Sequence, residues 1–131
     1  MEIKIEKPFC LYLDVAETDE HVPSMRMQVV IAVQQFGHSL EYRGNVWFDC
    51  SVWDTFVTGL NGVGEGEAQL VDMGGHFTLW LGAVSGTPVI SWEMRKAGVT
   101  GAVATASFRS PIDEDTLAHV KNQFTQFDRW W

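Results

Sequence analysis

Apolar residues recur at every second position through the first half of this chain. The alternation covers residues 3–5, 9–15 and 25–33, and it resumes over residues 40–48 after a break at Gly37. A period of two is typical of β-strands with one buried face, because successive side chains point to opposite faces of a sheet. The sequence therefore predicts several strands in this half, with residues 25–48 forming a hairpin. The polar run at residues 17–21 is expected to be a loop.

Two segments have the spacing of helices instead. Val52, Trp53, Phe56 and Leu60 predict a short helix that begins at Ser51, where Asp54 stands in capping-box spacing. A second helix is predicted from Ser110 as N-cap, with Pro111 in the first turn and Asp113 completing the cap. Its apolar stripe consists of Leu117, Val120, Phe124, Phe127 and Trp131. The aromatic pair Trp130-Trp131 is expected to be docked on the protein.

The second half returns to strands between the two helices. Residues 68–70 are expected to pair with residues 77–81, and two more strands are expected over residues 89–94 and 99–108. The complete pattern predicts a single α+β domain over residues 1–131. It would hold a mainly antiparallel sheet of roughly seven strands, with the short helix and the C-terminal helix packed on it. No internal repeat and no linker is apparent.

The charge of the chain is strongly acidic. Nine Lys and Arg against seventeen Asp and Glu give a formal net charge of −8. Such a field repels nucleic-acid phosphates and anionic lipid, and it favours a basic partner. Glu65 and Glu67 lie in a glycine-rich turn, and together with Asp72 they are candidate contacts for a cationic protein. The alternative is that the acidity serves solubility alone.

Two features predict a cytoplasmic location. The N-terminal residues lack the apolar core of a signal peptide, and the longest apolar run, residues 29–33, is too short to span a bilayer. Cys10 and Cys50 are far apart in the chain and are expected to be buried, reduced thiols, with neither a disulfide nor a metal between them. Cys50 precedes the short helix, but it is expected to be a small buried residue and not a nucleophile.

No motif of catalysis or of cofactor binding stands out. The four histidines are scattered, without the spacing of a metal site, and no Gly-x-Ser-x-Gly motif occurs. His76 follows the turn Gly74-Gly75 and is expected to bond to backbone groups there. A pair of carboxylates converging in space stays open as a catalytic alternative. The sequence also leaves open whether a tryptophan lines a pocket, and the candidates are Trp47, Trp53, Trp80 and Trp92.

Four blocks in order resemble the WapI-type immunity proteins of bacteria and related small proteins. They are Ser51-Val52-Trp53-Asp54-Thr55-Phe56, Gly74-Gly75-His76-Phe77-Thr78-Leu79, Trp92, and Phe108 leading through Ser110-Pro111-Ile112-Asp113 to Phe127. The resemblance implies a cytoplasmic, non-enzymatic α+β protein that neutralises a toxin by binding it. It assigns no functional residue, because the family has no catalytic motif.

Three hypotheses about function follow. The first is a binding protein for a macromolecule, with a basic toxin domain as one candidate partner. The second is a small-molecule-binding β-rich domain, and the third is an enzyme whose residues converge only in three dimensions. An apolar cavity with a few polar groups would favour the second, while a broad acidic surface without a pocket would favour the first. The sequence predicts no cofactor and leaves homo-oligomerisation open.

Overall fold

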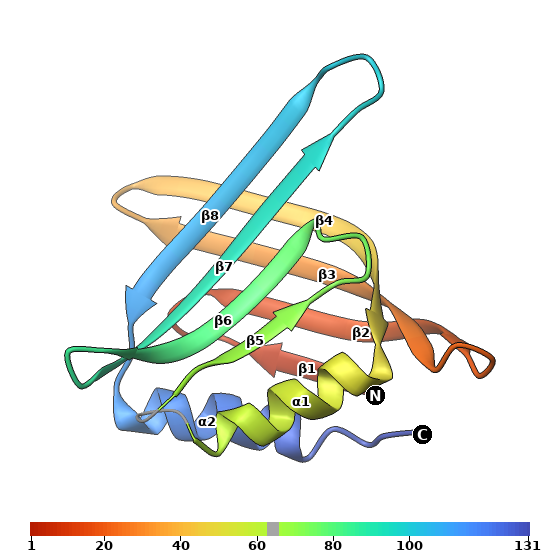
Figure 1. The fold of residues 1–131 in the computed structure, drawn as a ribbon. Coiled ribbons are helices and arrows are strands. Elements are labelled where there is room, and N and C mark those ends of the chain that lie inside the picture. Colours follow the sequence, from red (N-terminus) through yellow and green to blue (C-terminus); the bar gives the residue numbers. More distant parts are fainter. Residues whose placement is uncertain (63–65) are drawn as a thin grey trace.

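The computed structural model describes residues 1–62 and 66–131, and within them the chain forms eight strands and two helices (Figure 1). In chain order these are β1 (Glu2–Ile5), β2 (Cys10–Asp19), β3 (Ser24–Gln35), β4 (His38–Asp49), α1 (Cys50–Leu60), β5 (Ala68–Val71), β6 (Phe77–Val84), β7 (Thr87–Ala97), β8 (Val103–Pro111) and α2 (Glu114–Thr125). The predicted α+β class with antiparallel pairing is confirmed.

The strands divide into two sheets and not one. β1–β4 form an antiparallel sheet in chain order, and β5–β8 form a second one, so the described strands number eight where roughly seven were expected. The division falls at α1, which separates β4 from β5 in the chain. Periodicity shows which residues form strands, but it carries no information on where a sheet ends.

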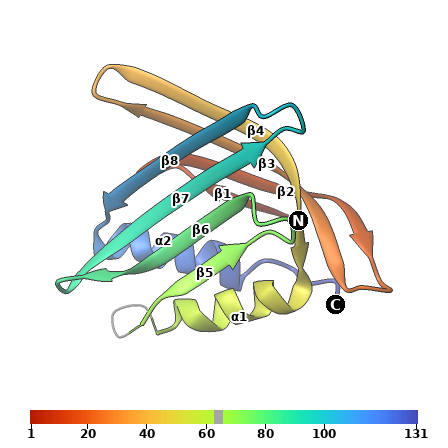
Figure 2. The ribbon, with the colours of Figure 1, turned by 45° about the horizontal axis from the view of Figure 1, so that its top comes forward.

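The two sheets pack face to face, and their strands cross (Figures 1 and 2). Aromatic side chains from both sheets meet between them. The Phe48 and Phe77 rings lie 6.3 Å apart, and Phe9 packs edge-on against Phe108 at 5.7 Å. Edge-to-face contacts of this kind add stability beyond the burial of apolar area. One apolar core therefore extends from the first sheet to the second and includes the buried faces of both helices.

The helices lie beside β1 and β5, along one open side of the sandwich (Figure 1). Each begins one residue after an aspartate, which is Asp49 for α1 and Asp113 for α2. The predicted N-caps Ser51 and Ser110 are wrong, because the aspartate carboxylates accept the first backbone N–H groups. Pro111 belongs to the end of β8 and not to the first helical turn.

The apolar stripe of the C-terminal segment is largely confirmed. Leu117, Val120 and Phe124 on α2 are buried, and so is Phe127, which follows the end of the helix. Trp131 is half-buried. The stripe therefore continues from α2 into the segment after it.

The chain has an internal structural repeat that is not apparent in its sequence. Four antiparallel strands followed by one helix occur twice. In each unit the first strand has four residues, and the helix buries the residues four, seven and eleven positions after its capping aspartate. These are Trp53, Phe56 and Leu60 in α1, and Leu117, Val120 and Phe124 in α2. The residue types differ at every one of these positions, which hides the repeat in the sequence.

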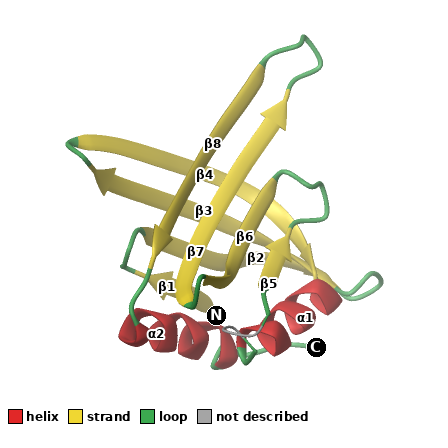
Figure 3. Cartoon of the chain, turned by 60° about the vertical axis from the view of Figure 1, so that its left-hand side comes forward, coloured by secondary structure: helices red, strands yellow, loops and turns green. Residues whose placement is uncertain are grey.

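Two strands differ in length from the prediction. β2 continues to Asp19 and includes residues that were expected to be a loop, with a register shift between Val15 and Glu17. β8 begins at Val103, because Val99 lies in the turn after β7. Figure 3 shows the β3–β4 and β7–β8 hairpins projecting away from the helices. Neither helix is long and apolar enough to cross a membrane in the part of the chain that the structure describes.

Candidate functional site

A groove lies where β4 of the first sheet meets the β5–β6 turn of the second. Its volume is ≈ 550 Å³. Four segments that are distant in sequence supply its walls, namely the β2–β3 turn, β4, the β5–β6 turn and the outer half of β7. The lining residues are Asp19, Val22, Ser24, Tyr42, Asn45, Val46, Trp47, Asp72, Met73, Gly74, His76, Met94 and Lys96.

Much of the groove wall is apolar. Val46 is buried, Tyr42, Trp47 and Met94 are half-buried, and Met73 remains 53% exposed. The backbone N–H of Met73 donates to the carbonyl of Trp47 at 2.7 Å, which ties the β5–β6 turn to β4. This bond joins the two sheets at the groove and fixes the distance between its walls. Of the four tryptophans considered from the sequence, the groove is lined by Trp47.

Asp72 holds the turn that forms one wall of the groove. Its carboxylate accepts the backbone N–H groups of Gly74 at 3.3 Å, of His76 at 2.7 Å and of Phe77 at 2.8 Å. The residue is only 6% exposed. The three bonds satisfy the hydrogen-bonding capacity of this buried side chain. Asp72 was a candidate contact for a cationic protein, and this stays a prediction; the turn folds around its side chain and leaves little of it exposed.

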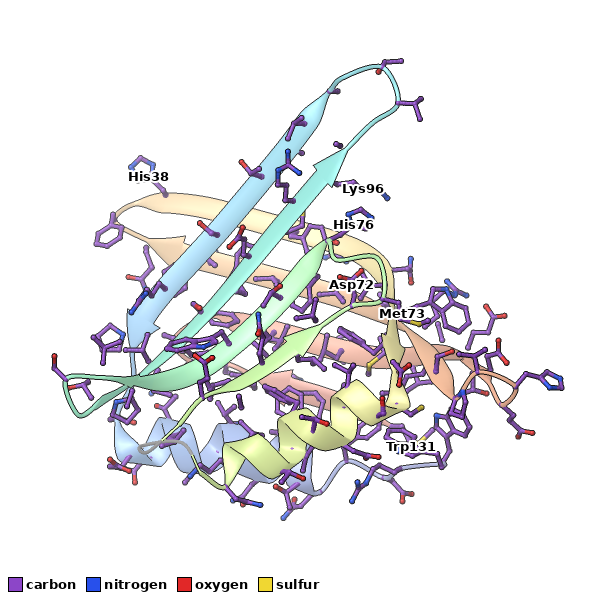
Figure 4. All side chains as sticks on the ribbon, in the orientation of Figure 1. His38, Asp72, Met73, His76, Lys96 and Trp131 are labelled. Atoms are coloured by element: carbon purple, nitrogen blue, oxygen red, sulfur yellow. The ribbon has the colours of Figure 1, made fainter. Side chains whose placement is uncertain are left out.

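His76 and Lys96 form the polar end of the groove, as Figure 4 shows above Asp72 and Met73. The His76 ring lies over Gly74, where a Cβ atom would come within 2.8 Å of the ring carbon Cδ2. Its Nδ1 is 3.2 Å from the carbonyl oxygen of Arg95, so the predicted bonding of this histidine to backbone groups is confirmed. With the proton on Nδ1, the other ring nitrogen stays available to a ligand.

Lys96 stands on β7 with its side chain exposed. Within residues 1–62 and 66–131, no carboxylate lies within ion-pair distance of its ammonium group. Most Lys and Arg side chains of the described residues also have no such partner, so the place of Lys96 at the mouth of the groove is what distinguishes it. It is a natural contact for an anionic group on a ligand.

The Tyr42 side chain lies along β4 in the groove, with its hydroxyl next to Gly44. A Cβ atom at Gly44 would lie 2.6 Å from the Tyr42 hydroxyl oxygen, so only glycine leaves room for this ring position. Burial raises the pKa of the Tyr42 phenol, and the negative charge of Asp72 raises it further. The phenol therefore stays neutral at physiological pH and offers the groove a hydrogen-bond donor.

The other predicted contact residues lie elsewhere. Glu67 is exposed and accepts a hydrogen bond from the indole N–H of Trp80 at 2.7 Å, while the Arg109 guanidinium lies 5.7 Å from the centre of that ring. Glu65 lies outside the described residues. Glu67 and Asp72 stand at opposite ends of β5, so these two do not form one acidic patch. That Glu65 or Glu67 contacts a partner stays a prediction.

Cys50 is buried, as the sequence predicted. Burial raises the pKa of its thiol to about 11, and the nearby carboxylates of Asp49 and Asp54 contribute to the shift. The effect of the helix N-terminus is therefore outweighed, and the thiolate is disfavoured. Cys10 is exposed, so its predicted burial is wrong. Among the residues that the structure describes, no group of three His, Cys, Asp or Glu side chains lies close enough together to hold a metal ion.

Most groove residues carried no signal in the sequence. Tyr42, Met73, Met94 and Lys96 belong to no motif. The sequence drew attention to Trp47, to Asp72 and to the turn before His76, but not to their meeting in one groove. Comparison of the chain with protein-family models, curated proteins and solved structures found no match. The resemblance to WapI-type immunity proteins therefore stays an expectation from the sequence, and function has to be argued from the groove.

Proposed function

We propose that this protein binds a small amphipathic molecule in the groove between its sheets, and that it does not transform this molecule. The ligand would have an apolar body and an anionic head group. The groove itself carries the proposal, because its volume of ≈ 550 Å³ and its few polar groups are typical of small-molecule sites.

The walls suit an apolar body of variable shape. Trp47 offers a flat aromatic surface, while Met73 and Met94 offer flexible thioether side chains that adapt to irregular shapes. Met73 is also one of the larger exposed apolar side chains of the described residues, and a ligand in the groove would cover it. The gain from removing this surface from water is the main driving force of binding.

The polar end of the groove suits an anionic head group. Lys96 would supply the charge at this end of the groove. His76, with its proton on Nδ1, presents Nε2 as an acceptor, so it would bond a hydroxyl or N–H group carried beside the anionic group of the ligand. A charge-assisted bond fixes the orientation of a ligand more strongly than a neutral one does. The apolar body would then extend toward Trp47 and Val22.

The state of Asp72 favours binding over catalysis. Its carboxylate is occupied by three backbone N–H groups, which hold the turn that shapes the wall. A general base needs a free position within hydrogen-bond reach of the substrate proton. His76 keeps such a position at Nε2 when Nδ1 is bonded to the backbone of β7, so turnover is tested together with binding.

A second candidate is a cytoplasmic immunity protein that neutralises a basic toxin domain by direct binding. The net charge of −8 and the resemblance described above favour it. Association with such a partner would slow as salt rises, and Glu67→Lys would slow it further. This candidate would come first if a toxin were purified from the same cells in a stoichiometric complex with the protein. Binding of a small molecule in the groove should then leave the stability of that complex unchanged.

The groove is tested by titration with 8-anilinonaphthalene-1-sulfonate, which combines an apolar aromatic body with a sulfonate. We expect saturable binding to one site, with a change in the intrinsic tryptophan fluorescence of the protein. Lys96→Glu should weaken binding on the order of tenfold through the lost charge, and Met73→Asp should weaken it by a similar factor. Lys121→Glu on α2 makes the same charge change elsewhere and serves as the control.

Three results would contradict the proposal. The first is the absence of saturable binding to the folded protein, and the second is equal affinity of the Lys96→Glu, Met73→Asp and control variants. The third is turnover of a substrate in the groove, which would replace binding with catalysis. Circular dichroism of each variant shows whether binding was measured on folded protein.

A further inference from the structure

Each sheet has two edge strands, and three of the four are protected. β1 and β5 have four residues each and lie beside the helices, where the backbone N–H of Lys4 donates to the Gln123 side chain. β4 is long, but it carries the charged side chains of Glu41 and Arg43. Short edges, covering helices and edge charges are the means by which natural proteins prevent unwanted strand pairing.

β8 has none of these protections over most of its length. It is an edge of the second sheet with nine residues, and its register with β7 runs from Val103 to Pro111 without a shift. From Ala97 to Phe108 the chain contains no Asp, Glu, Lys or Arg. The backbone N–H and C=O groups on the outer side of this strand therefore form an open, regular and uncharged edge.

The β7–β8 hairpin also leaves the body of the protein. Figure 3 shows its end projecting beyond the sandwich, away from both helices. Val103 is 54% exposed, and Val99 at the turn is completely exposed. Residues on both faces of this part of the hairpin are in contact with solvent. Apolar side chains beside an open edge add a driving force for pairing to its hydrogen bonds.

We propose that β8 pairs antiparallel with β8 of a second copy of this chain, so that the two second sheets merge into one continuous sheet. The two-fold axis would pass near Thr105 and Ala106, the middle of the uncharged part of the strand. Around such an axis each residue faces its own copy or that of a close neighbour. An uncharged strand is compatible with this arrangement, whereas a charged one would place like charges opposite each other.

The net charge of the whole chain also favours the β8 edge as the contact between two copies. Two copies with a net charge of −8 each repel one another over most of their surface. Contact through a strand without charge keeps the acidic groups of the two copies apart. The dimer should therefore strengthen as salt rises, because salt screens the remaining repulsion. Binding to a basic partner would respond to salt in the opposite way.

Sedimentation velocity over a range of protein concentrations and salt concentrations tests this inference. We expect a monomer–dimer equilibrium that shifts toward dimer in higher salt. Thr105→Lys and Thr105→Asp should each be monomeric, since each places like charges across the axis. An equimolar mixture of the two variants should form a heterodimer. Ser39→Lys, an exposed position on edge strand β4, should leave the equilibrium unchanged.

Hydrogen exchange of the unmodified protein gives a second readout that needs no variant. Amides of Val103–Phe108 on the open side should become more protected as the concentration rises, and those of β4 should not. A protein that stays monomeric at high concentration and high salt would overturn the inference. A dimer that forms without protection of β8, or that both Thr105 variants retain, would overturn it equally.

Discussion

Trp131 donates its indole N–H to the carboxylate of Asp54 on α1, at 3.1 and 3.0 Å from the two oxygens. The guanidinium of Arg129 donates to the same carboxylate at 2.6 Å. These bonds attach the segment after α2 to the other helix, 77 residues away in the chain. The expectation that the terminal aromatic pair is docked is therefore confirmed.

Removing only the indole N–H tests the strength of this attachment. Trp131→Phe keeps an aromatic ring and loses the donor, so we expect a loss of about 1 kcal/mol in the free energy of unfolding. Trp130→Phe is the matched control, because the buried Trp130 indole N–H has no partner among the described residues. Urea unfolding of both variants gives the comparison. Equal losses would show that the Trp131 hydrogen bonds contribute nothing.

Phe124 is the residue of α2 on which we expect stability to depend most. It is 1% exposed and packs against the rings of Trp53 at 5.4 Å and Phe56 at 4.9 Å. Phe124→Ala should cost on the order of 3–5 kcal/mol, because it leaves a cavity between the two helices. Phe36→Ala, at a position 90% exposed, should cost less than about 0.5 kcal/mol. A loss below about 1 kcal/mol for Phe124→Ala would mean that the helices repack around the gap.

The sequence predicted what depends on local periodicity. Alternation located β3 and β4, and helical spacing located the buried residues Trp53 and Phe124. The residue at which a helix begins depends on smaller differences in capping energy between neighbouring side chains. Ser51 and Asp49 both have side chains that cap helices, and the structure uses Asp49, which also accepts the Ser51 hydroxyl at 2.6 Å.

The groove could not be predicted, because its residues belong to segments that meet only in the folded protein. Trp47, Met73 and Met94 follow the strand pattern or the turn in which they lie, and nothing in their spacing connects them. The sheet division and the internal repeat were missed for the same physical reason. Strand pairing across the chain depends on backbone hydrogen bonds, which are common to all residue types except proline.

The capping aspartates should make stability depend on acid. The Ser51 side chain and backbone lower the pKa of Asp49 below its ordinary 3.8, and the Thr116 side chain and backbone do the same for Asp113. A lowered pKa in the folded state means that the stabilisation is fully present well above pH 3.8 and is lost as the pH falls through the lowered value. The double variant Asp49→Asn/Asp113→Asn keeps side chains that cap helices but do not titrate. Its urea stability should therefore fall less between pH 5 and pH 3 than that of the unmodified protein, and parallel curves would contradict this assignment.

The two cysteines should differ sharply in reactivity. Cys50 is buried with its thiol pKa raised to about 11, whereas Cys10 is exposed. Iodoacetamide at about pH 8 should therefore modify one thiol per folded chain, and both thiols in urea. Mass spectrometry counts the added groups. Cys10→Ser should leave the folded protein unmodified, and rapid modification of this variant without denaturant would show that Cys50 is accessible.

Asp72 should stabilise the turn and the groove together. Asp72→Ala leaves the buried backbone N–H of Phe77 without its acceptor, which costs about 1–3 kcal/mol. The N–H of His76 loses the same acceptor at a part-buried place, where water can replace part of the bond. Asp72→Asn keeps one side-chain oxygen for these donors and should cost clearly less. Both variants remove the same charge, so the difference between them reports hydrogen bonding and not electrostatics.

The same pair of variants connects the turn with ligand binding. If the turn positions Met73 and His76, Asp72→Ala should weaken anilinonaphthalene sulfonate binding more than Asp72→Asn does, measured where both variants are folded. Electrostatics alone predicts the opposite, because removing a negative charge near the groove would strengthen binding of an anion equally in both variants. If both variants bound the anion equally well and more tightly than the unmodified protein, Asp72 would act through its charge. The groove would then keep its shape without these hydrogen bonds.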